Sequence, residues 1–371
     1  MTLRCEFDVV CLTNQIPAHA LRAVFTTDVM ERLQGMRFPS ENTRWRMNVL
    51  QACGPMPSDP SKRIEVRAWR AQKAAWEAYV SAAFLCGLFE GAPGADLRAR
   101  LTGDDDDNFR GATAECMACW FLQGPLKLGL SRVSLGEPDD SLDMQATTAT
   151  ASFGIEVKAP YRERPRNEGW SGDESDKIIQ CVQAANKQFQ KNRANVLVLA
   201  PMLRTQIFFD RESLLHALFV ESVLAWYVDV GDNDVEVPHE SWTEFRPSGC
   251  FLNTKAPSGN KLKQSGQPRY QRISAILCIE EVLVEKFPSP LLRLLPGCPR
   301  KESRDTTIEI MRRQKEAYLS PGNQCWITHR ALIVHNPHAY HRLPEGIWAQ
   351  YPQLVPRGDV MEWTDGYECV V

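Results

Sequence analysis

The spacing of apolar residues along the chain predicts a series of helices. Between residues 62 and 90, apolar side chains recur every three or four positions, which is typical of an amphipathic helix that covers a core. Residues 109–123 are apolar nearly all the way round, so a buried helix is expected there, with Asp107 or Asn108 as its cap. A third helix is expected at 175–192.

Short apolar or alternating runs predict strands between and after these helices. They occupy residues 128–134, 142–148, 153–159, 195–201, 272–284 and 330–337. The run at 195–201 is unbroken and ends at a proline, which is typical of a buried strand. The order helix, strands, helix, strand predicts an α/β fold. One more helix is expected at 301–318.

Turn-forming sequences and changes in regularity divide the chain into three expected regions. A partly helical N-terminal region covers 1–100, an α/β core covers 101–235, and an α+β C-terminal extension covers 236–371. The cluster APGAD at 92–96 precedes the core, DDDDN at 104–108 lies near its start, and the chain becomes more irregular after it. The extension includes a loop rich in Gly, Ser and Pro that carries basic residues and no acid.

The composition is that of an ordinary globular protein. Of the 371 residues, 43% are hydrophobic and 24% are charged, and the formal net charge is −3. The chain as a whole therefore lacks the positive charge that would indicate nucleic-acid binding. Any surface that binds nucleic acid must be local. The N-terminus has no signal-peptide pattern and no apolar run reaches about 18 residues, so a cytoplasmic protein without membrane contact is expected.

Twelve cysteines are scattered among apolar neighbours, which indicates reduced thiols that mostly pack as small hydrophobic side chains. Cys116 and Cys119 have CxxC spacing. A structural zinc site needs two further ligands at matching spacing, and the chain has no second CxxC. Helix packing is therefore favoured over zinc binding for this pair.

The strand FGIEVKA carries the most informative pattern. Alternation places Phe153, Ile155 and Val157 on one face. The other face then holds Glu156 and Lys158 side by side. Acidic and basic side chains are rarely buried unless they are paired. A plain salt bridge, or a solvated face of an edge strand, is the alternative to a functional site.

Two more acidic side chains are expected to join this pair. Asp143 begins the preceding strand, and a hairpin with residue 148 opposite 153 would place it opposite Lys158. Glu115 is the only acid in the apolar helix 109–123, where its small helical neighbours let a partner come close. Carboxylate oxygens suit Mg²⁺, and a nearby lysine orients the attacking water and stabilises the developing charge.

Asp143, followed by Glu156-Val157-Lys158 on the next strand, resembles the D…(D/E)xK signature of the PD-(D/E)xK nuclease superfamily. The resemblance covers about residues 109–201. It implies a mixed central sheet flanked by helices, which is the restriction-endonuclease-like core. It also implies an enzyme that hydrolyses phosphodiester bonds with the help of a metal ion.

The resemblance assigns roles to individual side chains. Asp143 and Glu156 are expected to bind Mg²⁺, for which Mn²⁺ substitutes, and Glu115 on the preceding helix is expected to join the metal site and assist catalysis. Lys158 is the expected catalytic lysine that positions the attacking water. The chain also contains the dipeptide Pro-Asp of the family name, at residues 138–139. Asp139 is expected to lie too early along the strand to reach the metal.

The resemblance further implies a DNA substrate, with RNA as the second candidate. In this superfamily a polar residue on the next helix commonly faces the site, and the candidates are Gln183, Lys187 and Gln188. Two basic loops are expected to contact phosphate groups, and the alternative is that they are solvated surface. The residues singled out in these loops are Arg162, Arg164, Lys261, Lys263 and Arg269.

The expected function is thus a metal-dependent endonuclease that cuts DNA, with bacterial defence as a setting suggested by analogy. A homo-oligomer or an activating protein partner stays open. One alternative is a catalytically silent nuclease-fold module that binds nucleic acid or protein partners. Another is a structural subunit of a larger assembly. The intact Asp, Glu and Lys set favours the enzyme, because a binding module has no need of it.

Overall fold

The computed structural model divides into two compact units, which are described separately. The described residues of the sheet unit lie within Phe121–Glu280 and Ala331–Cys369, and those of the helical unit lie within Cys5–Trp120 and Glu281–Arg330. The residues that the structure describes are 19–55, 57–124, 129–131, 142–149, 151–161, 175–202, 211–226, 230–231, 234–235, 241–247, 250–251, 268–286, 324–349, 351–357 and 360–364.

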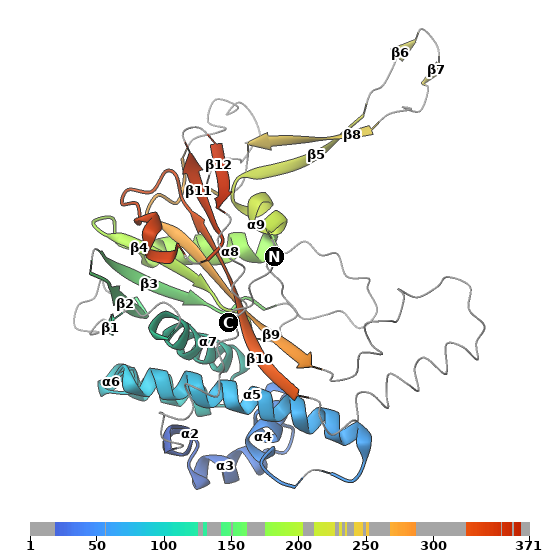
Figure 1. Ribbon diagram of the computed structural model, residues 1–371, viewed down its shortest axis with the longest axis vertical. Coiled ribbons are helices and arrows are strands. Elements are labelled where there is room, and N and C mark those ends of the chain that lie inside the picture. The colour runs from blue at the N-terminus through green and yellow to red at the C-terminus, as the bar shows by residue number, and fades with distance from the viewer. Residues whose placement is uncertain are drawn as a thin grey trace. The chain divides into compact units, whose positions relative to one another are not determined.

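The N-terminal part of the chain is helical, as Figure 1 shows. Its helices are α2 (His19–Val24), α3 (Thr27–Gln34), α4 (Glu41–Gln51), α5 (Pro60–Leu85), α6 (Gly91–Thr102) and α7 (Asp106–Gln123). The predicted helix at 62–90 is confirmed as α5, although it ends five residues earlier. Among the described residues, no helix combines the length and the hydropathy needed to cross a membrane.

An aromatic cluster holds α4, α5 and the start of α7 together. Trp76 of α5 stacks on Phe25, with ring centroids 5.4 Å apart. Trp45 and Phe109 each meet the Trp76 ring edge-on, at 5.0 and 5.4 Å. Large buried aromatic rings contribute much apolar area, so this cluster supplies a large share of the helical core.

Helix α7 begins three residues before the predicted start, because the acidic run at 104–107 is its N-terminus. The backbone N–H of Asn108 donates to the side chain of Asp105 at 2.7 Å. Carboxylates are favoured there because they accept from free backbone N–H groups and interact with the helix dipole. The predicted cap, Asp107 or Asn108, is therefore wrong by two or three residues.

Among the described residues, the sheet is mixed and has eight strands in the order β1-β2-β3-β4-β9-β10-β11-β12. The strands are β1 (Gly129–Ser131), β2 (Met144–Thr147), β3 (Ser152–Lys158), β4 (Ala194–Leu199), β9 (Ala275–Lys286), β10 (Gln324–His335), β11 (Gln353–Arg357) and β12 (Val360–Thr364). β3, β4 and β9 are parallel, as are β10 and β11, and the outer pairs are antiparallel. This confirms the α/β fold with a mixed sheet, and strands from both sides of the predicted boundary at 235/236 share it.

Further strands form two small ladders. They are β5 (Val220–Trp226) with β8 (Ser241–Pro247), and β6 (Val230–Gly231) with β7 (Asp234–Val235). The helix expected at 301–318 lies outside the described residues.

Helices α8 (Ser175–Gln188) and α9 (Arg211–Leu218) cover one face of the sheet. Ile178 and Val182 of α8 pack with Leu197 and Leu199 of β4 in one buried cluster. On β3, Phe153 packs against Trp348 of the 3₁₀ helix η4 (Glu345–Trp348), with ring centroids 5.8 Å apart. β3 and β4 are parallel, so the chain needs a crossover between them, and α8 forms it.

The hairpin of β2 and β3 has a different register from the predicted one. Met144 pairs with Ile155, which shifts the ladder by two residues. The reason is a shorter turn, since the Thr148 N–H donates to the Ala151 carbonyl at 2.7 Å. A shift of two residues keeps every side chain on its predicted face, whereas a shift of one would reverse the faces.

Gly154 on β3 lies where a side chain has no room, which gives a test of this packing. A Cβ at this position would lie 2.5 Å from Leu142 Cδ1 and 2.9 Å from Asn195 Oδ1. Gly154→Ala is therefore expected to lower the free energy of unfolding by about 1–3 kcal/mol, measured by urea denaturation. Gly346→Ala is the matched control, because nothing lies within 4 Å of its Cβ position. Equal effects of the two substitutions would contradict the packing.

Candidate functional site

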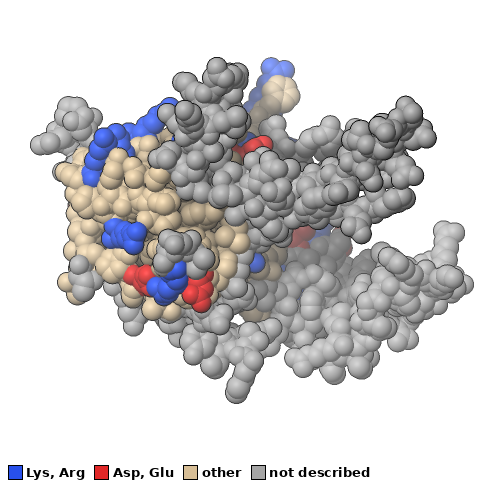
Figure 2. Space-filling view, turned by 90° about the horizontal axis from the view of Figure 1, so that it is seen from above, with Lys and Arg blue, Asp and Glu red and all other residues tan. Residues whose placement is uncertain are grey.

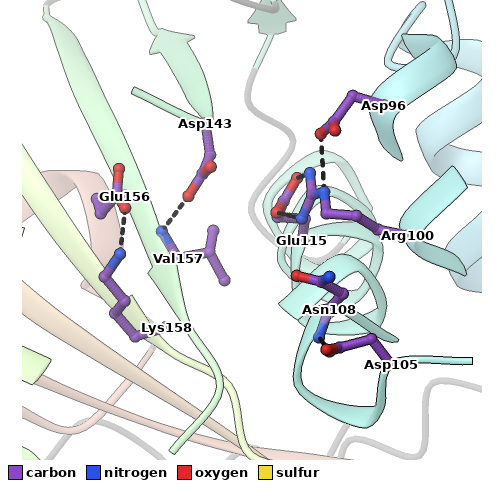
Figure 3. Close-up of polar contacts among 9 residues, drawn as sticks. All are labelled: Asp96, Arg100, Asp105, Asn108, Glu115, Asp143, Glu156, Val157 and Lys158. Carbon is purple, nitrogen blue, oxygen red and sulfur yellow. Dashed lines mark hydrogen bonds and ion pairs between the residues drawn. The ribbon is translucent and has the colours of Figure 1, made fainter. Parts of the chain in front are cut away.

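Glu156 and Lys158 form an ion pair on β3, and Figure 3 shows both on the opposite side of the strand from the Val157 side chain. Lys158 Nζ lies 2.5 Å from Glu156 Oε1. The Glu156 residue is only 2% exposed. The predicted faces of this strand are thus confirmed. The alternative of a solvated edge strand is wrong, because β3 lies between β2 and β4.

Helix α8 contributes a third polar side chain to this group. Lys158 Nζ also donates to Gln188 Oε1 at 3.0 Å, across 30 residues of sequence. Of the three candidates on this helix, Gln188 is the one with a contact to Lys158, whereas Gln183 and Lys187 are exposed. Cys181 lies near the same lysine. Burial raises the pKa of the Cys181 thiol to about 11, although the positive charge of Lys158 opposes this shift.

Asp143 reaches the same strand from the residue before β2. Its carboxylate oxygen Oδ2 accepts a hydrogen bond from the backbone N–H of Val157 at 2.7 Å, as drawn in Figure 3. The bond lies beyond the last pair of the ladder, Met144 with Ile155, so the side chain takes the place of a strand partner. The carboxylate is thereby held at the backbone between Glu156 and Lys158.

Glu115 belongs to the helical unit and is paired there with an arginine. Arg100 of α6 donates from Nη1 to Glu115 Oε1 at 2.6 Å and from Nη2 to Oε2 at 3.1 Å. Asp96 binds the same guanidinium through Nε at 2.8 Å. The small neighbours of Glu115 thus admit a close partner, as expected, and that partner is Arg100. Metal binding by Glu115 stays a prediction, and it requires Arg100 to release one of these oxygens.

The site offers oxygen donors of the type that Mg²⁺ prefers. Asp143 and Glu156 present carboxylates from adjacent segments of the hairpin. Mg²⁺ commonly binds through one or two carboxylates, together with waters and phosphate oxygens of the substrate. Within the described ranges, no group of three or more His, Cys, Asp and Glu residues has an arrangement that could hold a metal ion. The donors that the candidate site offers among the described residues are these two carboxylates.

The expected nucleic-acid contacts are only partly described. Lys187 is exposed on α8. Arg269 is half-buried, with its guanidinium carbon 5.0 Å from the centroid of the Tyr270 ring. Figure 2 views the molecule from above and shows Lys and Arg side chains in several separate places on the described surface. The remaining candidates lie outside the described residues, namely Arg162, Arg164, Lys261 and Lys263.

A second buried polar group, in the helical unit, was not foreseen from the sequence. Tyr79 of α5 donates its hydroxyl hydrogen to Glu281 Oε1 at 2.7 Å, and its oxygen also contacts His329 Nε2. A carboxylate only accepts, so the tyrosine oxygen accepts from an Nε2–H of the histidine. These partners are 202 and 250 residues from Tyr79 in the chain, so no local pattern links them.

The fold and the site together define an α/β protein whose mixed sheet carries a buried Glu156 with partly buried Asp143, Lys158 and Gln188 around it. Comparisons with protein-family models, with curated proteins and with solved structures found no match to this chain. The geometry around β3 is therefore the basis for assigning a function.

His329 gives a pH-dependent test of the helical unit. Burial lowers the pKa of His329 to about 3, while the unfolded chain takes up this proton near pH 6.5. Because only the unfolded state binds the proton between these values, stability falls as the pH drops below about 6.5. The free energy of unfolding is expected to lose roughly 1 kcal/mol from this group between about pH 7.5 and 5.5.

His329→Gln is the variant that removes this proton-binding group, and it keeps a donor for Tyr79. The loss between the two pH values is expected to be smaller in His329→Gln than in the wild type, as measured by urea denaturation. His341→Gln replaces an exposed histidine and should behave as the wild type. An identical pH dependence in His329→Gln and the wild type would contradict a buried neutral histidine.

Proposed function

We propose that the chain is a metal-dependent endonuclease with a restriction-endonuclease-like core that hydrolyses phosphodiester bonds of DNA. One observation carries the proposal. Side chains from three separate segments meet at β3: Asp143 before β2, Glu156 and Lys158 on β3, and Gln188 on α8. The carboxylates and the lysine are the residue types that metal-assisted hydrolysis of a phosphodiester needs.

The position of the group in the sheet supports a functional role. Lys158 is the last residue of β3, which is parallel to β4 and β9. In open α/β sheets, ligands bind outside the carboxyl ends of the parallel strands. Buried ion pairs contribute little net stability compared with apolar packing. Chemistry is therefore a better reason than stability for an ionised carboxylate that is 2% exposed.

Asp143 and Glu156 would hold Mg²⁺ or Mn²⁺. When bound, such an ion lowers the pKa of a coordinated water and offsets the charge of the substrate phosphate. Lys158, on the same strand, orients the attacking water and stabilises negative charge on the phosphate oxygens. Gln188 holds the ammonium group of Lys158 in place through its 3.0 Å hydrogen bond.

The DNA backbone would follow basic side chains around this site. Lys187 is exposed on α8, one residue before Gln188. Arg269 lies in the same unit. Phosphate contacts of this kind position a duplex without reading its sequence. A cytoplasmic enzyme of bacterial defence, acting as a homo-oligomer or with an activating partner, is the setting that fits a nuclease of this class.

A second candidate is a catalytically silent module that keeps the nuclease fold and binds nucleic acid or protein. The tight pairing of Glu156 with Lys158 favours it, because a structural salt bridge has the same geometry. The two candidates differ in one measurable property, since only the enzyme cuts DNA and requires a divalent cation to do so.

Plasmid cleavage tests the proposal directly. The protein is expected to nick or linearise supercoiled plasmid with Mg²⁺ or Mn²⁺, and EDTA is expected to stop the reaction. Lys158→Gln should lower the rate about 100-fold or more, because the amide keeps a hydrogen bond to Glu156 but lacks the charge. Its circular dichroism spectrum should stay close to that of the wild type, whereas its unfolding midpoint should fall, because Glu156 loses the cation beside it.

Lys62→Ala is the matched control, since this lysine is exposed on α5, far along the sequence from the site residues. It should cut at the wild-type rate. A wild-type protein that binds DNA but never cuts it with either metal would favour the silent module. A folded Lys158→Gln variant with the wild-type rate would remove Lys158 from the mechanism.

The identity of the metal-binding aspartate gives a further prediction. Asp143→Asn is expected to lose metal-dependent cleavage, because the amide is a weaker ligand than the carboxylate that lies beside β3. Asp139→Asn, four residues earlier in the chain, should keep most of the activity. Initial rates over a range of Mg²⁺ concentrations measure both effects. The opposite ranking of the two variants would transfer the metal site to Asp139.

A further inference from the structure

Two thiols of the helical unit meet although they are 33 residues apart in the chain. Sγ of Cys119 lies 3.2 Å from Sγ of Cys86. Cys119 is fully buried on α7, whereas Cys86 is partly exposed just after the end of α5. The pair therefore joins a partly exposed cysteine to one that is inside the protein.

The end of α5 holds Cys86 in position. The Cys86 N–H donates to the Ala82 carbonyl at 3.0 Å, and the Leu88 N–H donates to the Ala83 carbonyl at 2.9 Å. Gly87 between them has a φ of 73°, in the left-handed region that glycine adopts at helix ends. The backbone of Cys86 is thus fixed by hydrogen bonds on both sides, and its thiol is held against α7.

The two thiols differ in reactivity. The hydrogen bond to Cys86, followed by burial, raises the pKa of the Cys119 thiol well above its usual value. Cys119 therefore stays protonated and does not react first, since the thiolate is the nucleophile. Cys116, one helical turn earlier, is also buried on α7 and is the competing partner for Cys86.

We propose that Cys86 and Cys119 are a redox-active pair that hydroperoxides oxidise to a disulfide. The Cys86 thiolate attacks one oxygen of hydrogen peroxide, the O–O bond breaks, and hydroxide leaves and is protonated to water. The sulfur of Cys119 then attacks the resulting sulfenic acid, and the S–O bond breaks. The leaving hydroxide takes the Cys119 proton as a second water. The two thiols lose two electrons and two protons, and one peroxide becomes two waters.

The geometry requires only a small movement for this bond. A disulfide has a sulfur separation of about 2.05 Å, so the two atoms must approach by about 1.2 Å from their present 3.2 Å. The product covalently joins the end of α5 to α7. The pair is independent of the nuclease proposal, because both residues lie in the helical unit.

Peptide mapping of the whole protein tests this pair. The protein is treated with hydrogen peroxide, its free thiols are alkylated, and it is digested with trypsin, which cuts after Arg98 and Arg110 between the two cysteines. The expected product is a peptide pair linked through Cys86 and Cys119 that has lost two hydrogen atoms. Dithiothreitol added before alkylation should remove the link.

Variants identify the partners. Cys86→Ser and Cys119→Ser should each abolish the link, whereas Cys116→Ser should keep it. Cys53→Ser replaces an exposed thiol and is the matched control, with the link unchanged. The proposal is overturned if peroxide leaves Cys86 and Cys119 separately alkylated or over-oxidised in the wild type. It is also overturned if the link persists in Cys119→Ser. The wild-type and Cys116→Ser maps decide the question even if another variant does not fold.

Discussion

The carboxylate of Glu156 lies almost completely out of contact with solvent, and the candidate site depends on how its charge is balanced. An ionised group in such a place needs a cation or several donors beside it. Lys158 supplies the cation at 2.5 Å, and its own ammonium group is held by Gln188 of α8. Any group that enters the site, whether a metal ion or a phosphate, must rearrange this balance. This requirement links the packing of β3 to its proposed chemistry.

The position of α8 in turn depends on polar contacts at the start of β4. The Asn195 amide donates to the carbonyl groups of Gln190, Arg193 and Arg272 at 2.8, 3.1 and 2.8 Å. The Arg272 guanidinium donates to the Phe189 carbonyl at 3.0 Å, just past the end of α8. Several hydrogen bonds from one buried amide favour a single arrangement of the segments that accept them. They place the end of α8 so that Gln188 reaches Lys158.

The helical unit also contains a buried charged side chain that is held by hydrogen bonds. The guanidinium of Arg46 donates to the carbonyl groups of Leu101 and Gly103 and lies 4.1 Å from the centroid of the Phe109 ring. Burial lowers its pKa to about 10, so it remains a cation at neutral pH. His329 is completely buried in the same unit, and burial lowers its pKa to about 3, so it is neutral instead. Burial disfavours the charged form of both side chains, and the guanidinium stays charged because its usual pKa lies far above neutral pH.

Local pattern alone was enough to predict the main helices and strands of the core and the face on which Glu156 and Lys158 lie. A repeat of two or of 3.6 residues depends only on near neighbours in the chain. The hairpin register required more, because the turn at Thr148 closes through a bond that the pattern does not contain. Lys158 pairs with Gln188, and Glu115 pairs with Arg100, because three-dimensional packing brings these separate segments together. Spacing along the sequence does not determine which distant segments come into contact, since many pairings satisfy the same local pattern.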